Sequence, residues 1–100
     1  MLFRSAYSDI GYQAFKAQKF DEAIANFTEA LKSDPTSVEA HVYIGYALIE
    51  VGKLDEAREH LSEALKLQPD DKALQEQLQL VLNQIQEQPS DQTTTPVRNK

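Results

Sequence analysis

The stretch FDEAIANFTEALKSDP, residues 20–35, decides the fold of this chain, because a close copy of it, LDEAREHLSEALKLQP, occupies residues 54–69. The two copies lie 34 residues apart, and residues 4–37 align with residues 38–71 without a gap at 13 identical positions. A fixed internal period of this length indicates a repeat whose units stack on one another. We therefore expect repeat one over residues 4–37 and repeat two over residues 38–71.

Each repeat has the apolar periodicity of two helices. Steps of three and four residues between apolar side chains predict amphipathic helices rather than strands, so the expected fold class is all-α. In repeat one the stripes are Ala6, Tyr7, Ile10 and Ala14, and then Phe20, Ala23, Ile24, Phe27, Ala30 and Leu31. In repeat two they are His41, Ile44 and Leu48, and then Leu54, Ala57, Leu61, Ala64 and Leu65.

Proline and capping residues separate these helices. Pro35 ends the helix before it, and Thr36 with Glu39 has the spacing of a capping box for the next helix. Asp70 is the predicted N-cap of a fifth helix over residues 71–87. That helix is apolar on one face and rich in glutamine and glutamate on the other, as expected where a stack ends. Residues 1–87 then form the domain, and the polar residues 88–100 are interpreted as a disordered tail.

The composition limits the possible functions. The chain has 100 residues, 41% of them hydrophobic, which suits one small domain. A net charge of −6 disfavours contact with phosphate backbones, so we expect no nucleic-acid partner. The sequence shows no apolar run near the roughly 18 residues of a membrane span and no secretory signal, which favours a cytoplasmic location. The absence of cysteine excludes disulfides and thiolate chemistry.

The repeat resembles the tetratricopeptide repeat. The matching positions are Gly11, Ala23, Phe27, Ala30 and Pro35 in repeat one, and Gly45, Ala57, Leu61, Ala64 and Pro69 in repeat two. Small residues at such positions let helix axes approach within about 8–10 Å. Departures from the family pattern are mild: Tyr7 and His41 replace a frequent tryptophan, and Ala14 and Leu48 a frequent tyrosine. The resemblance implies a short right-handed α-solenoid of two helix-turn-helix hairpins and a capping helix.

The same resemblance implies a non-catalytic protein–protein interaction module, a scaffold or assembly adaptor without a cofactor. In this family the first helices of the repeats line a concave groove. The positions placed on that groove are Asp9, Tyr12, Phe15, Lys16, Glu39, Val42, Tyr43, Tyr46, Ile49, Glu50, Gln77 and Leu80. Aromatic side chains are enriched at binding hot spots, and the acidic side chains give the rim a negative sign. We predict a groove for an apolar peptide segment; the alternative is that the aromatic side chains only pack between helices.

One known binding mode of the family is not expected here. Its carboxylate clamp grips the acidic C-termini of chaperones with lysine, asparagine and arginine side chains. The matching positions are Ser8, Tyr12, Tyr43, Ala73 and Gln77, and none carries the required group. We therefore do not expect chaperone tails to bind in this way.

Metal and catalytic sites are not expected either. His41 and His60 are the only histidines, and they lack the spacing of a metal-binding pair. Their simplest interpretation is one core and one surface histidine. The paired acids at residues 21–22 and 55–56 stand at helix starts, where the helix dipole explains them without acid–base catalysis.

An alternative function is self-association. The first repeat has no capping helix on its outer face, and the apolar residues Leu2 and Phe3 lie outside the repeat. These residues either cover that face or form a docking edge, for another copy of the chain or for an upstream repeat absent from this sequence. Docking of another copy predicts a structural protein that forms homo-oligomers through the N-terminal end of the solenoid.

Overall fold

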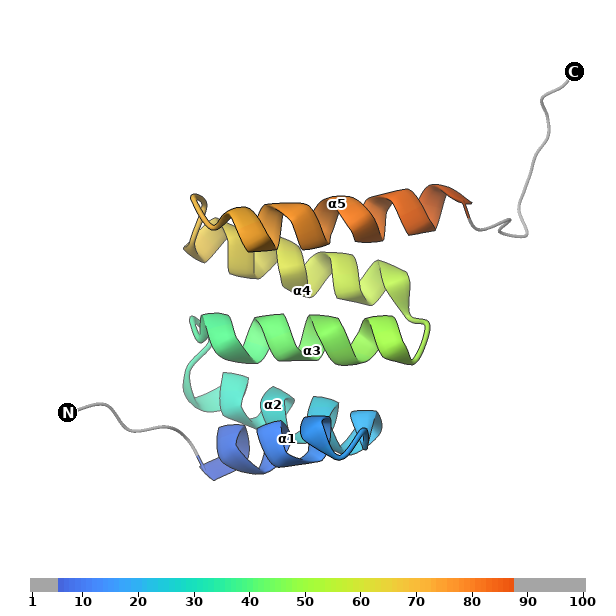
Figure 1. Cartoon of the computed structure of the whole chain (residues 1–100). Coiled ribbons are helices and arrows are strands. Elements are labelled where there is room, and N and C mark those ends of the chain that lie inside the picture. The colour runs from blue at the N-terminus through green and yellow to red at the C-terminus, as the bar shows by residue number, and fades with distance from the viewer. Residues whose placement is uncertain (1–5, 88–100) are drawn as a thin grey trace, which may run out of the picture.

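The computed structural model describes residues 6–87, which form five α-helices (Figure 1). These are α1 Ala6–Lys16, α2 Phe20–Ser33, α3 Val38–Glu50, α4 Leu54–Leu67 and α5 Lys72–Glu87. Successive helices run antiparallel and pack side by side, with α1 and α2 at one end of the stack and α5 at the other. The fold is an all-α helical solenoid, as the sequence repeat predicts. Residues 1–5, including Leu2 and Phe3, and the predicted tail over residues 88–100 lie outside the described residues.

The repeat extends to individual backbone hydrogen bonds. In the turn between α3 and α4, the Gly52 N–H donates to the Ile49 carbonyl at 3.0 Å and the Lys53 N–H donates to the Leu48 carbonyl at 2.8 Å. Residues 18–19 donate the same two bonds at the same distances, 34 positions earlier. This pair of bonds satisfies carbonyls at the end of a helix, which would otherwise lack a partner. Both hairpins therefore turn in the same way.

The central residue of each turn has a left-handed backbone. Gly52 has φ +85°, and Gln18 at the equivalent position of repeat one has φ +63°. Glycine adopts this conformation without a steric penalty, whereas a residue with a Cβ atom loses roughly 1–2 kcal/mol there. Repeat one thus carries a local strain that repeat two avoids.

The N-terminal caps of α3 and α5 also follow the repeat. The Ser37 hydroxyl accepts a hydrogen bond from the Ala40 N–H at 3.1 Å. The Asp71 carboxylate, 34 residues later, accepts one from the Leu74 N–H, also at 3.1 Å. Each cap satisfies one of the N–H groups that a helix start leaves without an intrahelical acceptor.

The sequence-based prediction of these caps was wrong by one residue in both places. Thr36 and Asp70 were expected, but Ser37 and Asp71 directly precede the first helical residues. A cap accepts from the third helical residue, so its position follows the true helix start. Thr36 has another role, since its N–H and hydroxyl both donate to the Asp34 carboxylate, at 3.1 and 2.7 Å.

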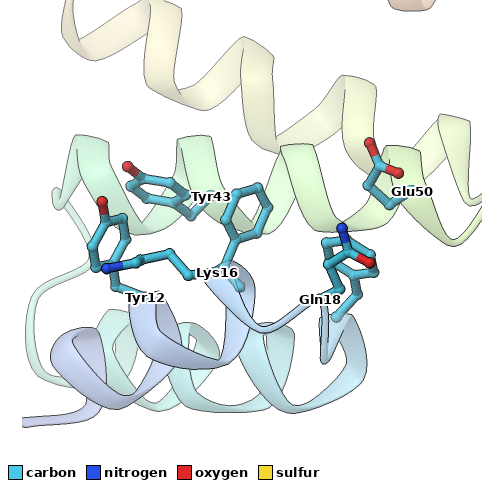
Figure 2. A pocket seen from close by; sticks show the side chains of 7 residues that line it. Tyr12, Lys16, Gln18, Tyr43 and Glu50 are labelled. Carbon is cyan, nitrogen blue, oxygen red and sulfur yellow. The ribbon is translucent and has the colours of Figure 1, made fainter.

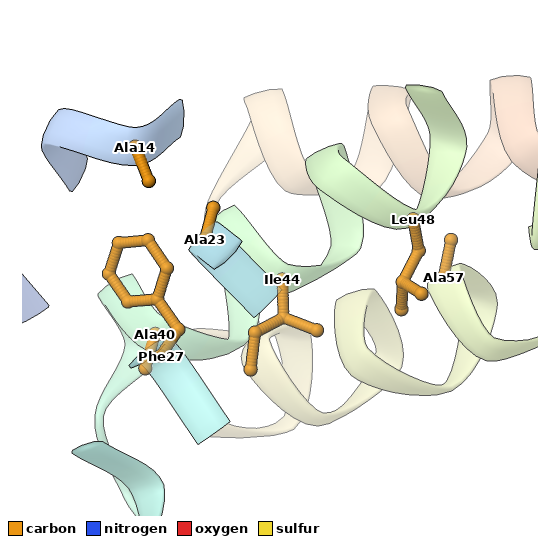
Figure 3. Close-up of a cluster of buried hydrophobic side chains, with 7 residues drawn as sticks. All are labelled: Ala14, Ala23, Phe27, Ala40, Ile44, Leu48 and Ala57. Atoms are coloured by element: carbon orange, nitrogen blue, oxygen red, sulfur yellow. The ribbon is translucent and has the colours of Figure 1, made fainter. Parts of the chain in front are cut away.

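The core is continuous along the stack and consists of two adjoining clusters. The first spans α1 to α4 and contains Ala14, Ala23, Phe27, Ala40, Ile44, Leu48 and Ala57 (Figure 3). The second spans α4 and α5 and contains Leu54, Leu61, Ala64, Leu74 and Val81. Each large side chain buried in this way contributes about 1.5–3 kcal/mol of transfer free energy. The alanines are the residues that bring the helices close together.

The apolar stripe predicted for the first helix only partly faces this core. Tyr7 and Ile10 are 45% and 52% exposed, whereas Ser8, Gly11 and Ala14 are the buried residues of α1. The helix packs against α2 and α3, and it lies at the end of the stack (Figure 1). The outer part of its stripe meets no earlier repeat within residues 6–87, so those side chains stay at the surface.

Glycine allows the two helices of each repeat to touch. A Cβ atom at Gly11 would lie 2.8 Å from Cδ2 of the Phe27 ring, and one at Gly45 would lie 2.9 Å from Cδ2 of Leu61. Phe27 and Leu61 are both fully buried. As the sequence predicts, the glycines leave room where α1 meets α2 and where α3 meets α4.

Replacing Gly11 by alanine should therefore destabilise the protein. Alanine in place of a helical glycine ordinarily adds up to about 1 kcal/mol of stability. Here overpacking against Phe27 should reverse the sign and lower the free energy of unfolding by about 1–3 kcal/mol in urea denaturation followed by circular dichroism. The control Gln13→Ala, on the exposed side of α1, should stay within about 0.5 kcal/mol of the wild type. A Gly11→Ala variant as stable as the wild type would contradict the packing described.

The strain in the turn of repeat one can be tested by separate substitutions of the two residues that have a left-handed backbone. Gln18→Gly should raise the free energy of unfolding by about 1 kcal/mol, because it removes the Cβ penalty. The corresponding variant Gly52→Ala should lower the free energy of unfolding, because only the backbone is strained: apart from the adjoining residues, no atom lies within 4 Å of the new Cβ. Both changes can be measured by thermal and urea unfolding. If both variants changed the free energy of unfolding in the same direction, the two turns would not be equivalent.

Candidate functional site

Four aromatic side chains from α1 and α3 form one group, here called the aromatic cluster: Tyr12, Phe15, Tyr43 and Tyr46. The ring centroids of Tyr12 and Phe15 lie 5.4 and 5.2 Å from that of Tyr43, in edge-to-face geometry. Tyr46 lies 6.1 Å from Tyr43 and 6.5 Å from Phe15. Such distances are within the range of favourable aromatic pairing. The two repeats are therefore joined at this point by aromatic contacts.

The helix geometry places these rings beside the core rather than within it. Tyr12 follows Gly11, and Tyr46 follows Gly45, so each ring lies about 100° around the helix from the glycine contact. All four members of the cluster are half-buried. Tyr43 is anchored most firmly, because its ring stacks on buried Phe27 at 5.3 Å with an angle of 8° between the rings.

A cavity of about 420 Å³ adjoins the cluster. It is lined by Tyr12, Phe15, Lys16, Gln18, Phe20, Tyr43 and Glu50. Figure 2 shows Tyr12 and Lys16 on α1 opposite Tyr43 on α3, with Gln18 and Glu50 towards the other end. Five of the residues that the sequence places on a groove thus surround one cavity between the two repeats.

Other residues predicted for the groove do not line this cavity. Val42 and Ile49 pack against the second core cluster, and Tyr46 packs against it while also belonging to the aromatic cluster. On α5, Gln77 is half-buried and Leu80 is 55% exposed. The remaining two predicted residues, Asp9 and Glu39, do not line the cavity. That these residues contact a ligand stays a prediction.

Sequence reasoning missed two residues of the cavity wall, Gln18 and Phe20. Phe20 was assigned only to the core stripe of the second helix, but its ring also meets Phe15 edge to face at 5.6 Å. Gln18 stands in the turn, where the repeat pairs it with Gly52. The alignment of Gln18 with Gly52 is visible in the sequence. A glycine at that position indicates a left-handed backbone, and this conformation places Gln18 in the cavity wall.

The electrostatics of the site are mixed. The ammonium group of Lys16 lies 5.2 Å from the ring centroid of Tyr12, a cation–π distance. Glu50 is exposed and brings a negative charge to the same cavity. Burial raises the pKa of Tyr46, and the Asp71 carboxylate raises it further, so this phenol stays neutral at pH 7. The site therefore offers aromatic surface between one cation and one anion.

Two further properties concern residues 6–87 only. None of their helices has the length and apolar character needed to cross a membrane. In the same range, no group of three or more histidine, cysteine or acidic side chains is arranged to hold a metal ion.

Comparisons with known proteins agree with this architecture. A search among curated proteins found no match. Among solved structures, the C-terminal TPR-containing domain of a Plasmodium falciparum protein described as an FK506-binding protein is similar, with a TM-score of 0.73 and 27% identity. The alignment covers 81% of this chain and 54% of that chain, so this chain spans about half the length of the solved one. The family model of the tetratricopeptide repeat matches residues 14–87, which is most of the chain, and the chain therefore belongs to the tetratricopeptide repeat family.

Proposed function

We propose that this chain is a non-catalytic scaffold or assembly adaptor that binds an apolar peptide segment at the aromatic cluster. Tetratricopeptide repeats generally mediate protein–protein interaction. The observation that carries the finer proposal is the half-buried aromatic cluster beside a cavity of about 420 Å³. A volume of this size falls within the range of ligand pockets, and its aromatic wall suits an apolar anchor.

The charges around the cavity suggest the neighbours of that anchor. Glu50 favours a basic residue on one side of the bound segment, and Lys16 favours an acidic residue or a carbonyl group on the other. Tyrosine hydroxyl groups supply hydrogen bonds without the desolvation cost of a buried charge. The proposed ligand is thus a short peptide with one or two large apolar side chains and a basic flank.

The proposal of a non-catalytic function rests on the position of the groups with shifted pKa values. Within residues 6–87 these groups are Lys32, Tyr46 and His60. None of them lines the cavity at the aromatic cluster, although His60 lines a separate cavity beside α4. Catalytic acids and bases are usually recognised by shifted pKa values inside a cleft. A cytoplasmic location remains part of the proposal.

Peptide selection provides the test of this function. Peptides that bind residues 1–100 would be selected from a random library. The affinity of an enriched peptide would then be measured by fluorescence polarisation. Enriched peptides should share a large apolar residue and a basic flank. The double variant Tyr12→Ala/Tyr46→Ala should bind at least about tenfold more weakly, because truncation of a hot-spot aromatic residue costs about 2 kcal/mol or more.

The matched control is Tyr7→Ala, which removes a tyrosine from the outer part of α1, away from the cavity. This variant should bind like the wild type. Circular dichroism would establish that all variants are folded. The groove proposal fails if the double variant keeps full affinity, or if Tyr7→Ala weakens binding equally.

A second candidate function is self-association through the outer face of α1. The favouring observation is the exposure of Ile10 at 52%, beside Tyr7 at 45%, at the end of the stack. Repeat units are stabilised by stacking on neighbours, and a second copy of this chain presents the same apolar side chains for a two-fold contact.

Sedimentation equilibrium of residues 1–100 over a wide concentration range tests this candidate. The wild type should form dimers or larger species, and Ile10→Glu should be monomeric, because a charge would have to be buried in the interface. Leu80→Glu, a change of the same kind on α5 at a residue that is 55% exposed, should associate like the wild type. A wild type that stays at 11.3 kDa at all concentrations would exclude the candidate.

A further inference from the structure

The two histidines of the chain meet between α3 and α4. Nδ1 of His41 lies 3.1 Å from Nδ1 of His60, and Nε2 of His41 lies 3.1 Å from the carbonyl oxygen of Pro35. His41 is 9% exposed and His60 is half-buried. Their contact joins residues 19 positions apart and therefore leaves no short spacing motif in the sequence. His41 is thus the core histidine and His60 the more exposed one, and the structure adds that their rings are in direct contact.

The surroundings determine which ring nitrogens carry protons. A carbonyl oxygen only accepts hydrogen bonds, so Nε2 of His41 must be the donor to Pro35. Neutral His41 consequently has a bare Nδ1, and Nδ1 of His60 must donate to it. The remaining lone pair of the neutral pair is on Nε2 of His60.

This arrangement accommodates one added proton but not two. A first proton on Nε2 of His60 leaves the hydrogen bond between the rings intact. A second proton has to bind Nδ1 of His41, where it would face the Nδ1–H of His60 across 3.1 Å. Two donors and two positive charges then oppose each other, and the rings must separate.

The charged groups around the pair act in both directions. Burial lowers the pKa of His60, and His41 on the facing helix lowers it further, while the carboxylates of Glu59, Glu56 and Glu63 raise it. A cavity of about 360 Å³ beside the pair is also lined by the cations Arg58 and Lys66. The ammonium group of Lys66 lies 3.1 Å from the Glu63 carboxylate and partly neutralises its charge. Burial and His41 outweigh the three carboxylates, so the pKa of His60 is lowered.

We propose that His41 and His60 form a pH-sensitive joint between α3 and α4, which closes when the pair is neutral and opens when both rings are charged. In the unfolded chain both histidines take up protons near the ordinary value of about 6.5. The folded chain takes up fewer protons, because the pKa of His60 is lowered and a second proton breaks the contact. The contribution of the pair to the free energy of unfolding is therefore fully present above about pH 6.5, and it declines as the pH falls below that value.

Opening of the joint would also affect the aromatic cluster, because α3 carries both His41 and Tyr43. The proposal itself does not depend on the groove, and neither do its tests. It stands on the ring contact, the carbonyl acceptor and the burial of the pair.

Nitrogen-15 NMR of the imidazole rings tests the proton positions directly. In the wild type at about pH 8, His41 should carry its proton on Nε2 and His60 on Nδ1, the less common tautomer of a free histidine side chain. Multiple-bond couplings between ring protons and nitrogens distinguish the two forms. Finding both rings with the proton on Nε2 would overturn the pair as described.

Thermal unfolding between about pH 7.5 and pH 5.5 tests the coupling to stability, because acidic side chains titrate mainly below this window. The wild-type Tm should fall by several degrees across it, since the only two histidines belong to the pair. The double variant His41→Gln/His60→Gln cannot titrate there, and its Tm should stay nearly constant. The single variant His60→Gln, which keeps an N–H donor for His41, should show an intermediate slope. A wild-type Tm independent of pH, or a double variant as pH-dependent as the wild type, would overturn the proposal.

Discussion

The rest of the structure depends on the close contact between the two helices of each repeat. Gly11 and Gly45 allow the side chains of Phe27 and Leu61 to lie where a Cβ atom would otherwise be. Buried alanines on α2 and α4 extend this close approach along the hairpins. Because α1 and α3 then lie with the same face against their partners, the residue after each glycine is brought to the edge of the core. Tyr12 and Tyr46 occupy those two positions, so the contact that holds each hairpin together also sets the aromatic cluster at its side.

Most of the fold could be predicted from the sequence because the repeat supplies each observation twice. The number and order of the helices, the glycine contacts and the packing of a fifth helix on repeat two follow from a period of 34 residues and the apolar stripes. Helix starts are less well determined. Neighbouring residues with similar side chains, such as Thr36 and Ser37 or Asp70 and Asp71, can all act as caps. Only the backbone determines which of them precedes the first turn.

The site was less predictable than the fold, for physical reasons that differ between residues. Tyr12, Phe15 and Tyr43 were expected together because the resemblance to the tetratricopeptide repeat implies that the first helices of the two repeats line one groove. The position of Gln18 depends on a turn conformation that is evident only by comparison with Gly52. The exposure of Tyr7 and Ile10 was not predictable, because periodicity shows which residues share a face but not whether another helix covers it. The contact between His41 and His60 depends on how two helices pack, and no local pattern encodes it.

These differences separate the two repeats energetically. Repeat two is covered on both sides, by repeat one and by α5, and its turn has glycine at the left-handed position. Repeat one has a strained glutamine in its turn and exposed apolar side chains on its outer helix. In a solenoid, stability is approximately the sum of the stabilities of the units and of their interfaces, so repeat one should open more readily than repeat two.

Repeat one also supplies Tyr12, Phe15 and Lys16 to the cavity. A ligand bound there would contact both repeats and stabilise the weaker one, because binding only to the folded state shifts the folding equilibrium. On this basis the proposed binding of a peptide and the folding of the first repeat are a single coupled equilibrium.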